Sequence, residues 1–384
     1  MLALMASSTP TPLYSIYAAE WSFSALAVTE VYAVYAICVL LALLLTGGLS
    51  DLIGRRPVIM SALLALVGSE TIFMFAGGLD WLYVARSLQG LATGLLLGAA
   101  GAALVDLHPR RDGGQAGLVN GIVSAGGIGL GALLSGLLVQ YARYPEVTPF
   151  VVIAVLAVLG AWAAWRLPET VATSGRRISL TPRVPNVPRV LWRTFGLSAL
   201  GVLASWSVGG LYLSLGPSII GQLHPTNNHA VGGAFVFVFS VCAVLAQWIL
   251  RDTPNRATVV GGSGLLAVGS VITAASISGG SLDGFLFGSV LVGLGFGAAF
   301  MGALRALAAV LPPAHRASVM AAFFVVAYFA ISVPAIGAGV AAVHIGLTSA
   351  ATWFGSAVAV VAALVAIIGW FELRPARAAS PSEH

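Results

Sequence analysis

Residues 47–57 read Gly-Gly-Leu-Ser-Asp-Leu-Ile-Gly-Arg-Arg-Pro, and this short charged stretch lies between two long apolar runs. Roughly 20 apolar residues precede it and roughly 20 follow it, and each run is long enough to cross the hydrocarbon core of a bilayer. The stretch therefore predicts a hairpin at the membrane surface between two transmembrane helices. Its acid and its two arginines indicate either a functional contact between helices or a solvated turn that only fixes topology.

The composition of the whole chain is that of a membrane protein. Of the 384 residues, 59% are hydrophobic and 8% are charged, whereas soluble domains carry about 25% charged residues. All 18 basic residues are arginine; this bias indicates a GC-rich genome and does not indicate nucleic-acid binding. Cys38 and Cys242 lie inside apolar runs and are expected to be buried free thiols, so no disulfide or metal site is predicted.

Turns and charges divide the chain into twelve predicted transmembrane helices. Fifteen arginines fall in loops on one side and only Arg143 falls on the other. Positive residues stay on the cytoplasmic side, so we expect both termini to be cytoplasmic in a multi-pass protein of the inner, cytoplasmic membrane of a bacterial cell. The first helix is short, and we expect a few native residues to precede it. The predicted spans are 1–18, 25–47, 58–78, 81–105, 115–140, 149–167, 193–216, 229–250, 257–277, 283–311, 315–342 and 348–371.

The spans predict an all-α membrane protein made of two pseudo-symmetric six-helix bundles. We place the bundles at 1–167 and 193–374, a cytoplasmic linker at 168–192 and a cytoplasmic tail at 375–384. The turn at 251–256 occupies the place in the second half where the charged hairpin would repeat. Internal repeats of this kind are typical of secondary transporters, whose substrate site lies between the repeats.

The hairpin resembles the loop between the second and third helices of the major facilitator superfamily. Its pattern of Gly, Leu, small residue, Asp, Gly and two basic residues is matched, although Leu52 replaces a basic residue that usually follows the Asp. The resemblance covers the whole chain through helix number, orientation and linker, and within the superfamily it implies the twelve-helix branch of drug:proton antiporters. It also implies a cytoplasmic gate that locks helix 2 against helix 11, and the matching residues are Gly47, Leu49, Ser50, Asp51, Gly54, Arg55 and Arg56.

Three charged residues inside predicted helices are candidates for proton coupling. Arg86, with Gln89 on the same face of helix 4, matches an Arg-Gln-Gly pattern that the superfamily links to proton transfer; alternatively, Arg86 only caps carbonyls of helix 1. An acid inside a membrane is a functional hypothesis by default. We prefer Glu30 as the proton carrier, tuned by Arg86, although Glu30 could instead reach interfacial water. Glu70 is a second candidate, or a helix–helix contact away from the cavity.

Glycines in helix 5 and prolines in helix 1 predict local departures from regular helix geometry or packing. The run Gly127-Ile128-Gly129 in helix 5 resembles the glycine-rich exporter signature of the superfamily, with Ile128 in place of its Pro; dense glycine also permits plain helix packing. In helix 1, Pro10 and Pro12 must distort the helix, and such breaks are tolerated where they line a cavity.

Aromatic and polar residues on predicted cavity-side helices are candidate substrate contacts. Rings can bind amphipathic or cationic compounds, although each ring could also serve packing alone. Arg305 could bind an anionic group or form a structural pair near the interface. The candidates are Tyr32, Tyr35, Gln89, Trp206, Tyr212, Arg305, Phe323 and Tyr328.

Taken together, the sequence predicts a monomeric, proton-coupled exporter of small organic or amphipathic molecules that works by alternating access. Its expected partners are a small-molecule substrate, protons and the lipid bilayer, with no cofactor, metal or nucleic acid. One alternative is an uptake symporter or facilitator for a sugar or an organic acid. Another is a receptor or scaffold that does not transport. An enzyme is not predicted, because the sequence shows no metal cluster, nucleophile triad or nucleotide loop.

Overall fold

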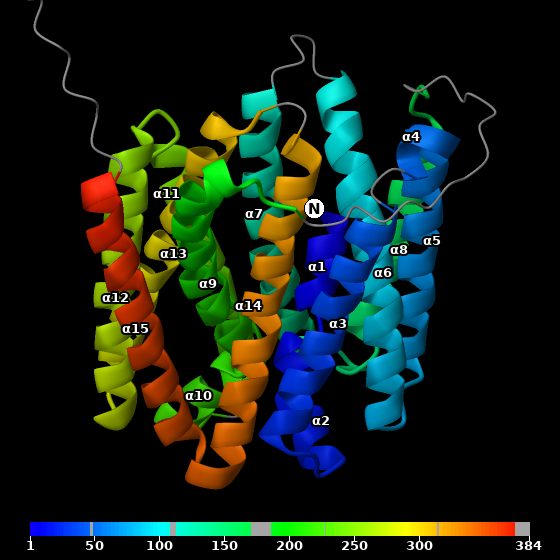
Figure 1. The fold of residues 1–384 in the computed structure, drawn as a ribbon. Coiled ribbons are helices and arrows are strands. Elements are labelled where there is room, and N and C mark those ends of the chain that lie inside the picture. The colour runs from blue at the N-terminus through cyan, green and yellow to red at the C-terminus, as the bar shows by residue number, and fades with distance from the viewer. Residues whose placement is uncertain (47–48, 108–112, 170–185, 227, 313–314, 373–384) are drawn as a thin grey trace, which may run out of the picture.

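The structure is a computed structural model that describes residues 1–46, 49–107, 113–169, 186–226, 228–312 and 315–372. Regular structure within these residues is helical, and eleven helices in them are long and apolar enough to cross a membrane. They run side by side as one bundle (Figure 1). Their bounds are α3 (Ala25–Thr46), α5 (Arg55–Met74), α6 (Leu79–Leu107), α7 (Gly113–Tyr141), α8 (Thr148–Trp165), α9 (Trp192–Ser214), α11 (Ala230–Ile249), α12 (Asn255–Ser278), α13 (Leu282–Val310), α14 (Arg316–Ile345) and α15 (Leu347–Glu372).

The first predicted span is broken into three pieces. These are α1 (Leu2–Ser8), the 3-10 turn η1 (Thr11–Leu13) and α2 (Tyr14–Glu20). Pro10 and Pro12 cause the break because proline lacks an N–H and its ring collides with the preceding turn. The distortion expected of helix 1 is therefore confirmed. In the second half, α9 is likewise followed by a separate short helix, α10 (Gly216–Leu223), with Pro217 in its first turn.

Helices pack first within each half of the chain and then across the two halves. In the first half α6 lies against α3 and α5, and α5 also lies against α8; in the second half α13 lies against α11 and α12, and α12 also lies against α15. The most extensive contacts between the halves are those of α3 with α14 and of α7 with α11. The predicted fold of twelve spans in two halves is thus confirmed, with the first span in pieces.

The two halves repeat the same local packing. Helices α6 and α13 are both 29 residues long, and each has a pair of glycines, four residues apart, that lets a helix of the same half, α3 or α11, approach closely. A Cβ atom at any of these glycines would come within 3 Å of a backbone carbonyl oxygen of that neighbour. The contacts are Gly90 to Tyr35 and Gly94 to Val39 on α3, and Gly293 to Phe239 and Gly297 to Ala243 on α11.

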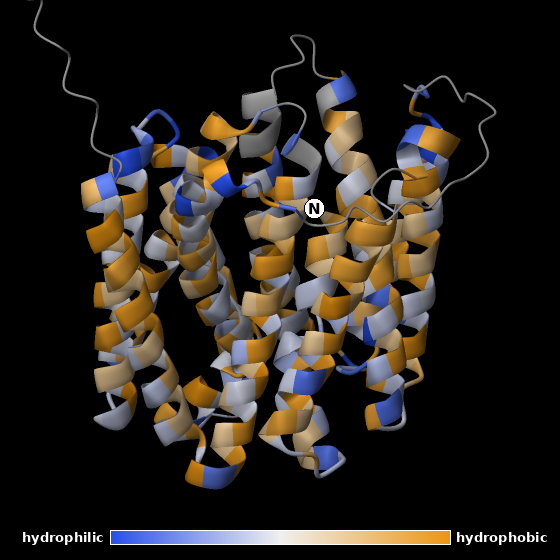
Figure 2. Ribbon diagram, viewed as in Figure 1, coloured by the Kyte–Doolittle hydropathy of each residue, from blue (hydrophilic) through white to orange (hydrophobic). Residues whose placement is uncertain are grey.

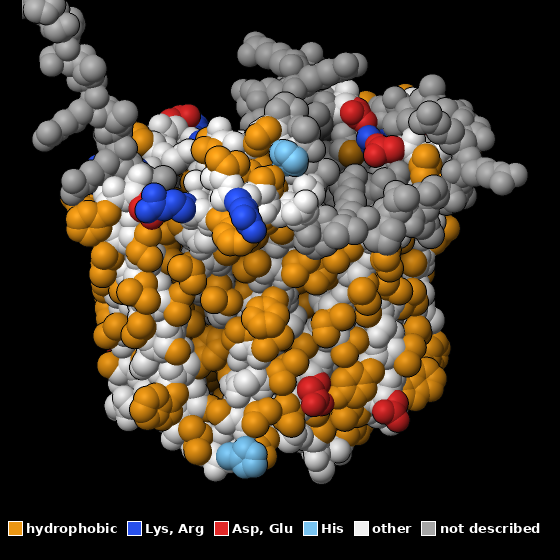
Figure 3. All heavy atoms as spheres, viewed as in Figure 1, with side chains coloured by type: hydrophobic (Ala, Val, Ile, Leu, Met, Phe, Trp, Pro, Cys, Tyr) orange, Lys and Arg blue, Asp and Glu red, His pale blue; other side chains and the backbone are white. Residues whose placement is uncertain are grey.

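Hydrophobic residues predominate along the length of the helices, and hydrophilic residues are more frequent toward the two ends of the bundle (Figure 2). Cationic side chains gather at one end of the face that Figure 3 shows. We call this the arginine-rich end; it carries the start of α5, the end of α8, the starts of α9 and α12, and the end of α15. The arginine-poor end carries the connection between α7 and α8, with Arg143.

The largest buried cluster of the described residues that is shared by the two halves lies toward the arginine-poor end. There one cluster contains Leu13 and Val31 from the first half together with Leu213 and Phe235 from the second. Toward the arginine-rich end the two halves have separate clusters, one around Val58, Leu63 and Ile153 and another around Leu191, Leu307 and Phe323. The halves are therefore held together most extensively at the arginine-poor end.

Candidate functional site

Arg86 is the centre of a buried polar network in the first half. Its side chain on α6 is fully buried. The guanidinium donates from Nε to the hydroxyl of Tyr14 at 2.8 Å and from Nη1 to the backbone carbonyl of Ser7 at 2.7 Å. Its Cζ atom lies 5.2 Å from the ring centroid of Tyr35 and 5.9 Å from that of Tyr32. A cation inside the membrane needs such partners, because burying it there alone is costly.

Gln89 connects this cation to an acid. Its Oε1 accepts from Nη1 of Arg86 at 2.5 Å, and its Nε2 donates to Oε1 of Glu70 on α5 at 2.9 Å. Glu70 is fully buried, and its Oε2 has no hydrogen-bond partner within the described residues. We call Tyr14, Arg86, Gln89 and Glu70 the buried polar network.

The broken first helix supplies acceptors for this network. In an α-helix the carbonyl of Ala6 would accept from residue 10, but Pro10 has no N–H. The carbonyl of Ala6 accepts instead from the backbone N–H of Thr9 at 3.2 Å and from Nε2 of Gln89 at 3.0 Å. The proline break therefore frees backbone oxygens that Arg86 and Gln89 occupy. Arg86 does cap a carbonyl of helix 1, as the alternative interpretation held, and it also joins an acid through Gln89.

Glu30, the preferred proton carrier in the sequence analysis, lies elsewhere. It is partly exposed near the start of α3, toward the arginine-poor end. Its Oε2 accepts a hydrogen bond from the hydroxyl of Tyr83 at 2.9 Å. In the described part of the chain the structure brings Glu70, rather than Glu30, into hydrogen-bond connection with Arg86.

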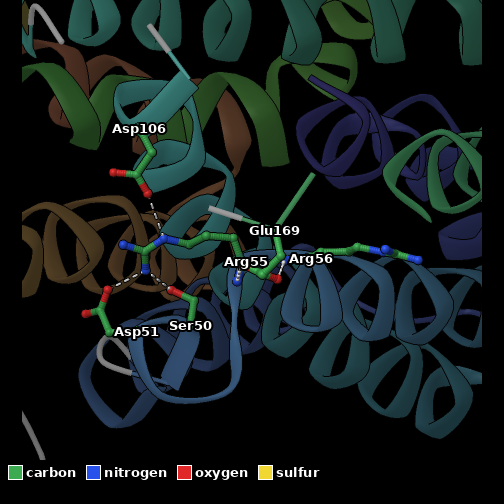
Figure 4. Close-up of polar contacts among 6 residues, drawn as sticks. All are labelled: Ser50, Asp51, Arg55, Arg56, Asp106 and Glu169. Atoms are coloured by element: carbon green, nitrogen blue, oxygen red, sulfur yellow. Dashed lines mark hydrogen bonds and ion pairs between the residues drawn. The ribbon is translucent and has the colours of Figure 1, made fainter. Parts of the chain in front are cut away.

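The charged hairpin forms a compact cluster at the arginine-rich end (Figure 4). Residues Leu49–Ile53 form the short helix α4. Arg55, the first residue of α5, pairs with Asp51 at 2.5 Å and with Asp106 near the end of α6 at 3.2 Å. Its Nη1 also donates to the hydroxyl of Ser50 at 2.6 Å. Among the described residues, these contacts lie within the first half and not on α14; Gly47 lies outside the described residues.

Glu169, just after α8, caps the N-terminus of α5 (Figure 4). Its two carboxylate oxygens accept from the backbone N–H groups of Arg55 and Arg56, at 2.9 Å and 3.1 Å. Negative charge is stabilised at a helix N-terminus, where N–H groups have no partner within the helix. Gly54 makes this possible: its φ is +101°, and a Cβ atom there would lie 2.5 Å from Oε2 of Glu169.

The predicted substrate-cavity residues of the second half separate into two groups. Trp206 lies at the boundary between the halves, with its ring 5.4 Å from that of Tyr328 in a T-shaped contact, and its Nε1 has no described partner. Tyr328 shares a buried cluster with Tyr35 of the first half. Phe323 is fully buried among neighbouring rings. These residues bring aromatic surface from both halves together.

Tyr212 and Arg305 make contacts inside the second half. Tyr212 is buried among phenylalanine rings, and its hydroxyl lies 3.1 Å from that of Ser289. Arg305 donates from Nη1 to the carbonyl of Leu250 at 3.2 Å, and from Nη2 to the carbonyl of Arg251. Arg305 thus caps the C-terminus of α11, where a cation is favourable.

The second half contains an uncharged counterpart of the buried polar network. Arg86 is the eighth residue of α6 and Ser289 is the eighth residue of α13. Each forms a hydrogen bond with a tyrosine of the first helix of its own half, Tyr14 or Tyr212. Only the first half places an arginine at this position, so the two repeats have the same geometry and different charge.

Sequence reasoning missed four residues of these clusters. Asp106, Glu169 and Tyr83 are single polar residues whose partners lie far away in sequence. Tyr14 lies two residues after Pro12, and the sequence analysis gave it no role. The signal for Asp106 and Glu169 was their position just after the ends of the predicted spans 81–105 and 149–167, on the same side as the charged hairpin.

The chain belongs to the major facilitator superfamily: the model of the Major Facilitator Superfamily matches residues 1–224. It is 39% identical over 107 residues to the MFS-type transporter gkaD of Penicillium citrinum, a match that covers 26% of this chain and 17% of that protein. It is 25% identical over 185 residues to the uncharacterized MFS-type transporter Rv1877 of Mycobacterium tuberculosis, which covers 46% of this chain and 24% of that protein. The chain therefore spans less than a quarter of the length of these curated relatives. It is a multi-pass membrane protein of a transporter family.

Two solved structures share the fold. The human organic anion transporter MFSD10 (TETRAN) superposes with a TM-score of 0.67 at 18% identity, covering 95% of this chain and 96% of that one. A bacterial homolog of the human lysosomal transporter Spinster, in an inward-facing and unoccupied conformation, superposes with a TM-score of 0.73 at 15% identity, covering 96% of this chain and 93% of that one. At these identities the likeness concerns the fold alone.

Proposed function

We propose that this protein exports small organic or amphipathic molecules in exchange for protons, by alternating access. The observation that carries the proposal is the hydrogen-bonded connection of Glu70 to Arg86 through Gln89. An acid and a cation buried together inside a membrane mark a proton or ion pathway by default. The free Oε2 of Glu70 is a place where a proton can be held without displacing the bond to Gln89.

Proton exchange at Glu70 would change the charge next to Arg86. When the carboxyl group is ionised it balances the guanidinium through the amide of Gln89, and when it is neutral the cation must rely on Tyr14 and the rings of Tyr32 and Tyr35. The preferred position of α6 against α1 and α3 would differ between the two states. Glu30 and Tyr83, nearer the arginine-poor end, would serve as the entry for protons.

The substrate would bind at the boundary of the two halves. Tyr35, Trp206 and Tyr328 present ring surface there, and the Nε1 of Trp206 offers a donor. Apolar surface with a few polar groups suits an amphipathic molecule. The continuous core toward the arginine-poor end suits a state that is closed on that side.

The orientation and the gate are also part of the proposal. With positive residues inside, the arginine-rich end faces the cytoplasm of a bacterial cell and both termini lie there. The cluster of Asp51 and Arg55 would stabilise the cytoplasmic ends of α3, α5 and α6 as one unit during closure. Asp51→Asn should then slow turnover and leave substrate affinity unchanged.

The decisive experiment is transport by purified protein in liposomes under an imposed pH gradient, with a fluorescent lipophilic cation as the probe. Glu70→Gln should abolish gradient-driven accumulation of the probe and keep exchange of probe for probe. Glu20→Gln, at the end of α2, is the matched control and should keep both. Gradient-driven accumulation by Glu70→Gln at the rate of the unmodified protein would overturn the role of Glu70.

The direction of flux in the same assay decides between export and its alternative. A symporter for a sugar or an organic acid could use the same network, and probe movement with the proton gradient rather than against it would favour that reading. If the protein binds the probe but moves none of it across the liposome membrane, a receptor that does not transport would be favoured.

A further inference from the structure

A hydrogen bond between Gln140 and His229 joins the two halves at the arginine-poor end. Gln140 lies in the last turn of α7, and His229 is the residue before α11. The side-chain Oε1 of Gln140 accepts from the backbone N–H of His229 at 2.8 Å. Between two described residues, no other hydrogen bond or ion pair connects 1–167 to 193–372. The remaining described contact between the halves is therefore packing without polar links.

The bond sits one helical turn from a close crossing of α7 and α11. A Cβ atom at Gly233 would collide with the carbonyl oxygen of Ala132, and a Cβ atom at Gly136 would lie 3.1 Å from Cα of Gly233. Glycines let helix backbones approach to this distance. Because Gln140 lies one turn beyond Gly136 on the same face of α7, the crossing brings its amide within reach of His229.

The other extensive crossing of the halves, α3 with α14, has no such link among the described residues. A Cβ atom at Gly339 of α14 would collide with Oγ1 of Thr29 on α3. That hydroxyl nevertheless donates within its own helix, to the carbonyl of Leu26 at 2.8 Å. Further along this crossing, Tyr35 and Tyr328 meet in a buried hydrophobic cluster. The directional contact between the halves is thus that of Gln140 with the start of α11.

This contact can be broken and remade at little cost. Gln140 and His229 are both half-buried at the end of the bundle, so water can replace each partner when α7 and α11 separate there. Breaking the bond then costs only the small net contribution of a neutral hydrogen bond. The next N–H of α11, that of Ala230, is capped by Oδ1 of Asn228 from the same half at 3.0 Å. The start of α11 therefore keeps a cap when Gln140 leaves.

We propose that Gln140 and the N–H of His229 form a latch that holds the protein closed at the arginine-poor end. The latch presupposes alternating access and so rests on the proposed function. It is made when the arginine-poor end is closed and broken when that end opens, and Gln140 thereby sets the balance between the two states. One neutral hydrogen bond corresponds to about a fivefold change in this balance.

Distances between two nitroxide labels, measured by pulsed electron paramagnetic resonance, test this latch. The sample is purified full-length protein in liposomes, without substrate and without a pH gradient. Labels are attached at Asp80→Cys and Asp283→Cys in a background of Cys38→Ser and Cys242→Ser. Asp80 and Asp283 are the exposed second residues of α6 and α13, at the arginine-poor end of each half. Gln140→Leu should raise the ratio of long to short distances about fivefold.

Two further variants separate the hydrogen bond from packing. Gln140→Glu retains an acceptor oxygen opposite the N-terminus of α11, where negative charge is favourable, and should keep the short distance. Gln222→Leu makes the same change as Gln140→Leu at the same end, but Gln222 bonds to Thr348 inside the second half, so the ratio should not change. An unchanged ratio in Gln140→Leu, or an equal rise in Gln140→Glu, would overturn the latch.

A single distance shared by all variants would also overturn the latch. Failure of proton coupling at Glu70 would leave the measurement unaffected, because neither a gradient nor substrate is present. If Gln140→Leu does not yield folded protein, Gly136→Ala takes its place. The new methyl group must push the backbone of α11 away and should raise the ratio, whereas Gly98→Ala, with open space around it, should not. Equal ratios in these two variants would contradict the latch.

Discussion

The amide of Gln89 stands between two opposite charges: its nitrogen donates to Oε1 of Glu70 at 2.9 Å, and its oxygen accepts from Arg86 at 2.5 Å. The amide has only one orientation that satisfies both neighbours, because the carboxylate offers acceptors and the guanidinium offers donors. The carboxyl group of Glu70 on α5 is therefore connected to the guanidinium of Arg86 on α6 through one side chain, that of Gln89.

Gln89→Leu should disconnect the acid from the cation. It leaves buried polar groups of Arg86 and Glu70 unpaired, which costs about 1–3 kcal/mol each, so we expect a clearly lowered Tm and loss of gradient-driven transport. Gln222→Leu is the control, because Gln222 makes its contact with Thr348 near the surface and should lose little stability. Normal coupling in Gln89→Leu would show that the amide does not transmit the charge.

Tyr14→Phe and Tyr212→Phe form a matched pair across the two halves. Tyr14 accepts from both Nε and Nη2 of Arg86, whereas Tyr212 faces the neutral hydroxyl of Ser289. Hydrogen bonds to charged groups contribute about 1.5–3 kcal/mol and neutral ones about 1 kcal/mol. Chemical or thermal unfolding should therefore show the larger loss for Tyr14→Phe, and equal losses would argue against a charged network in one half.

Gly54→Ala should disturb the cap of α5. The φ of +101° is unfavourable for alanine, and the new Cβ would collide with the carboxylate of Glu169. We expect a loss of at least about 1 kcal/mol of stability and a lower transport rate. Gly98→Ala is the control: it lies in α6 with open space around the new methyl group, and alanine inside a helix should be neutral or stabilising. A Gly54→Ala variant as stable as Gly98→Ala would contradict the cap.

Glu146, in the connection between α7 and α8, gives a pH dependence. Partial burial and, second, the charge of Glu20 raise the pKa of its carboxyl group above its usual value of 4.5. The folded state therefore binds this proton more tightly than the unfolded state, so stability is greatest below about pH 4.5 and falls as the pH rises through the raised pKa. Glu146→Gln should flatten this part of the Tm-against-pH curve, and Glu20→Gln should reduce its slope. If the Tm-against-pH curve of Glu146→Gln is the same as that of the unmodified protein, the pH dependence of stability arises from another group.

Much of the fold could be predicted from the sequence because membrane spans are long and nearly uniform. The predicted spans agree with the helices to within a few residues at most ends: the second was placed at 25–47 and α3 is Ala25–Thr46. The break in the first span was also predictable, since proline acts locally. The repeat could be inferred only coarsely from the sequence, because the matched positions Arg86 and Ser289 share no side-chain chemistry.

The partners of the charged residues were less predictable. Arg86 was recognised as buried, but its acid was assigned to Glu30, whereas Gln89 extends toward Glu70. The order of helices along the chain does not show which helix faces meet. Glu30 and Glu70 both lie within apolar stretches of the sequence, so the sequence did not distinguish them as partners of Arg86. Asp106 and Glu169 were missed for the same reason: they lie 51 and 114 residues from the arginine that they contact.

The neutral pair of Tyr212 and Ser289 has a consequence for how the proposed transport cycle would use energy. A duplicated architecture could draw on a proton gradient twice, once in each repeat, but within the described residues the second repeat places the neutral Ser289 where the first places Arg86. In the proposed cycle, protons would bind and leave in the first half only. The second half would follow its movement through the contacts of α3 with α14 and of α7 with α11. The number of protons per transport cycle would then be set by the repeat: one buried polar network with one acid, Glu70, would exchange one proton in each cycle.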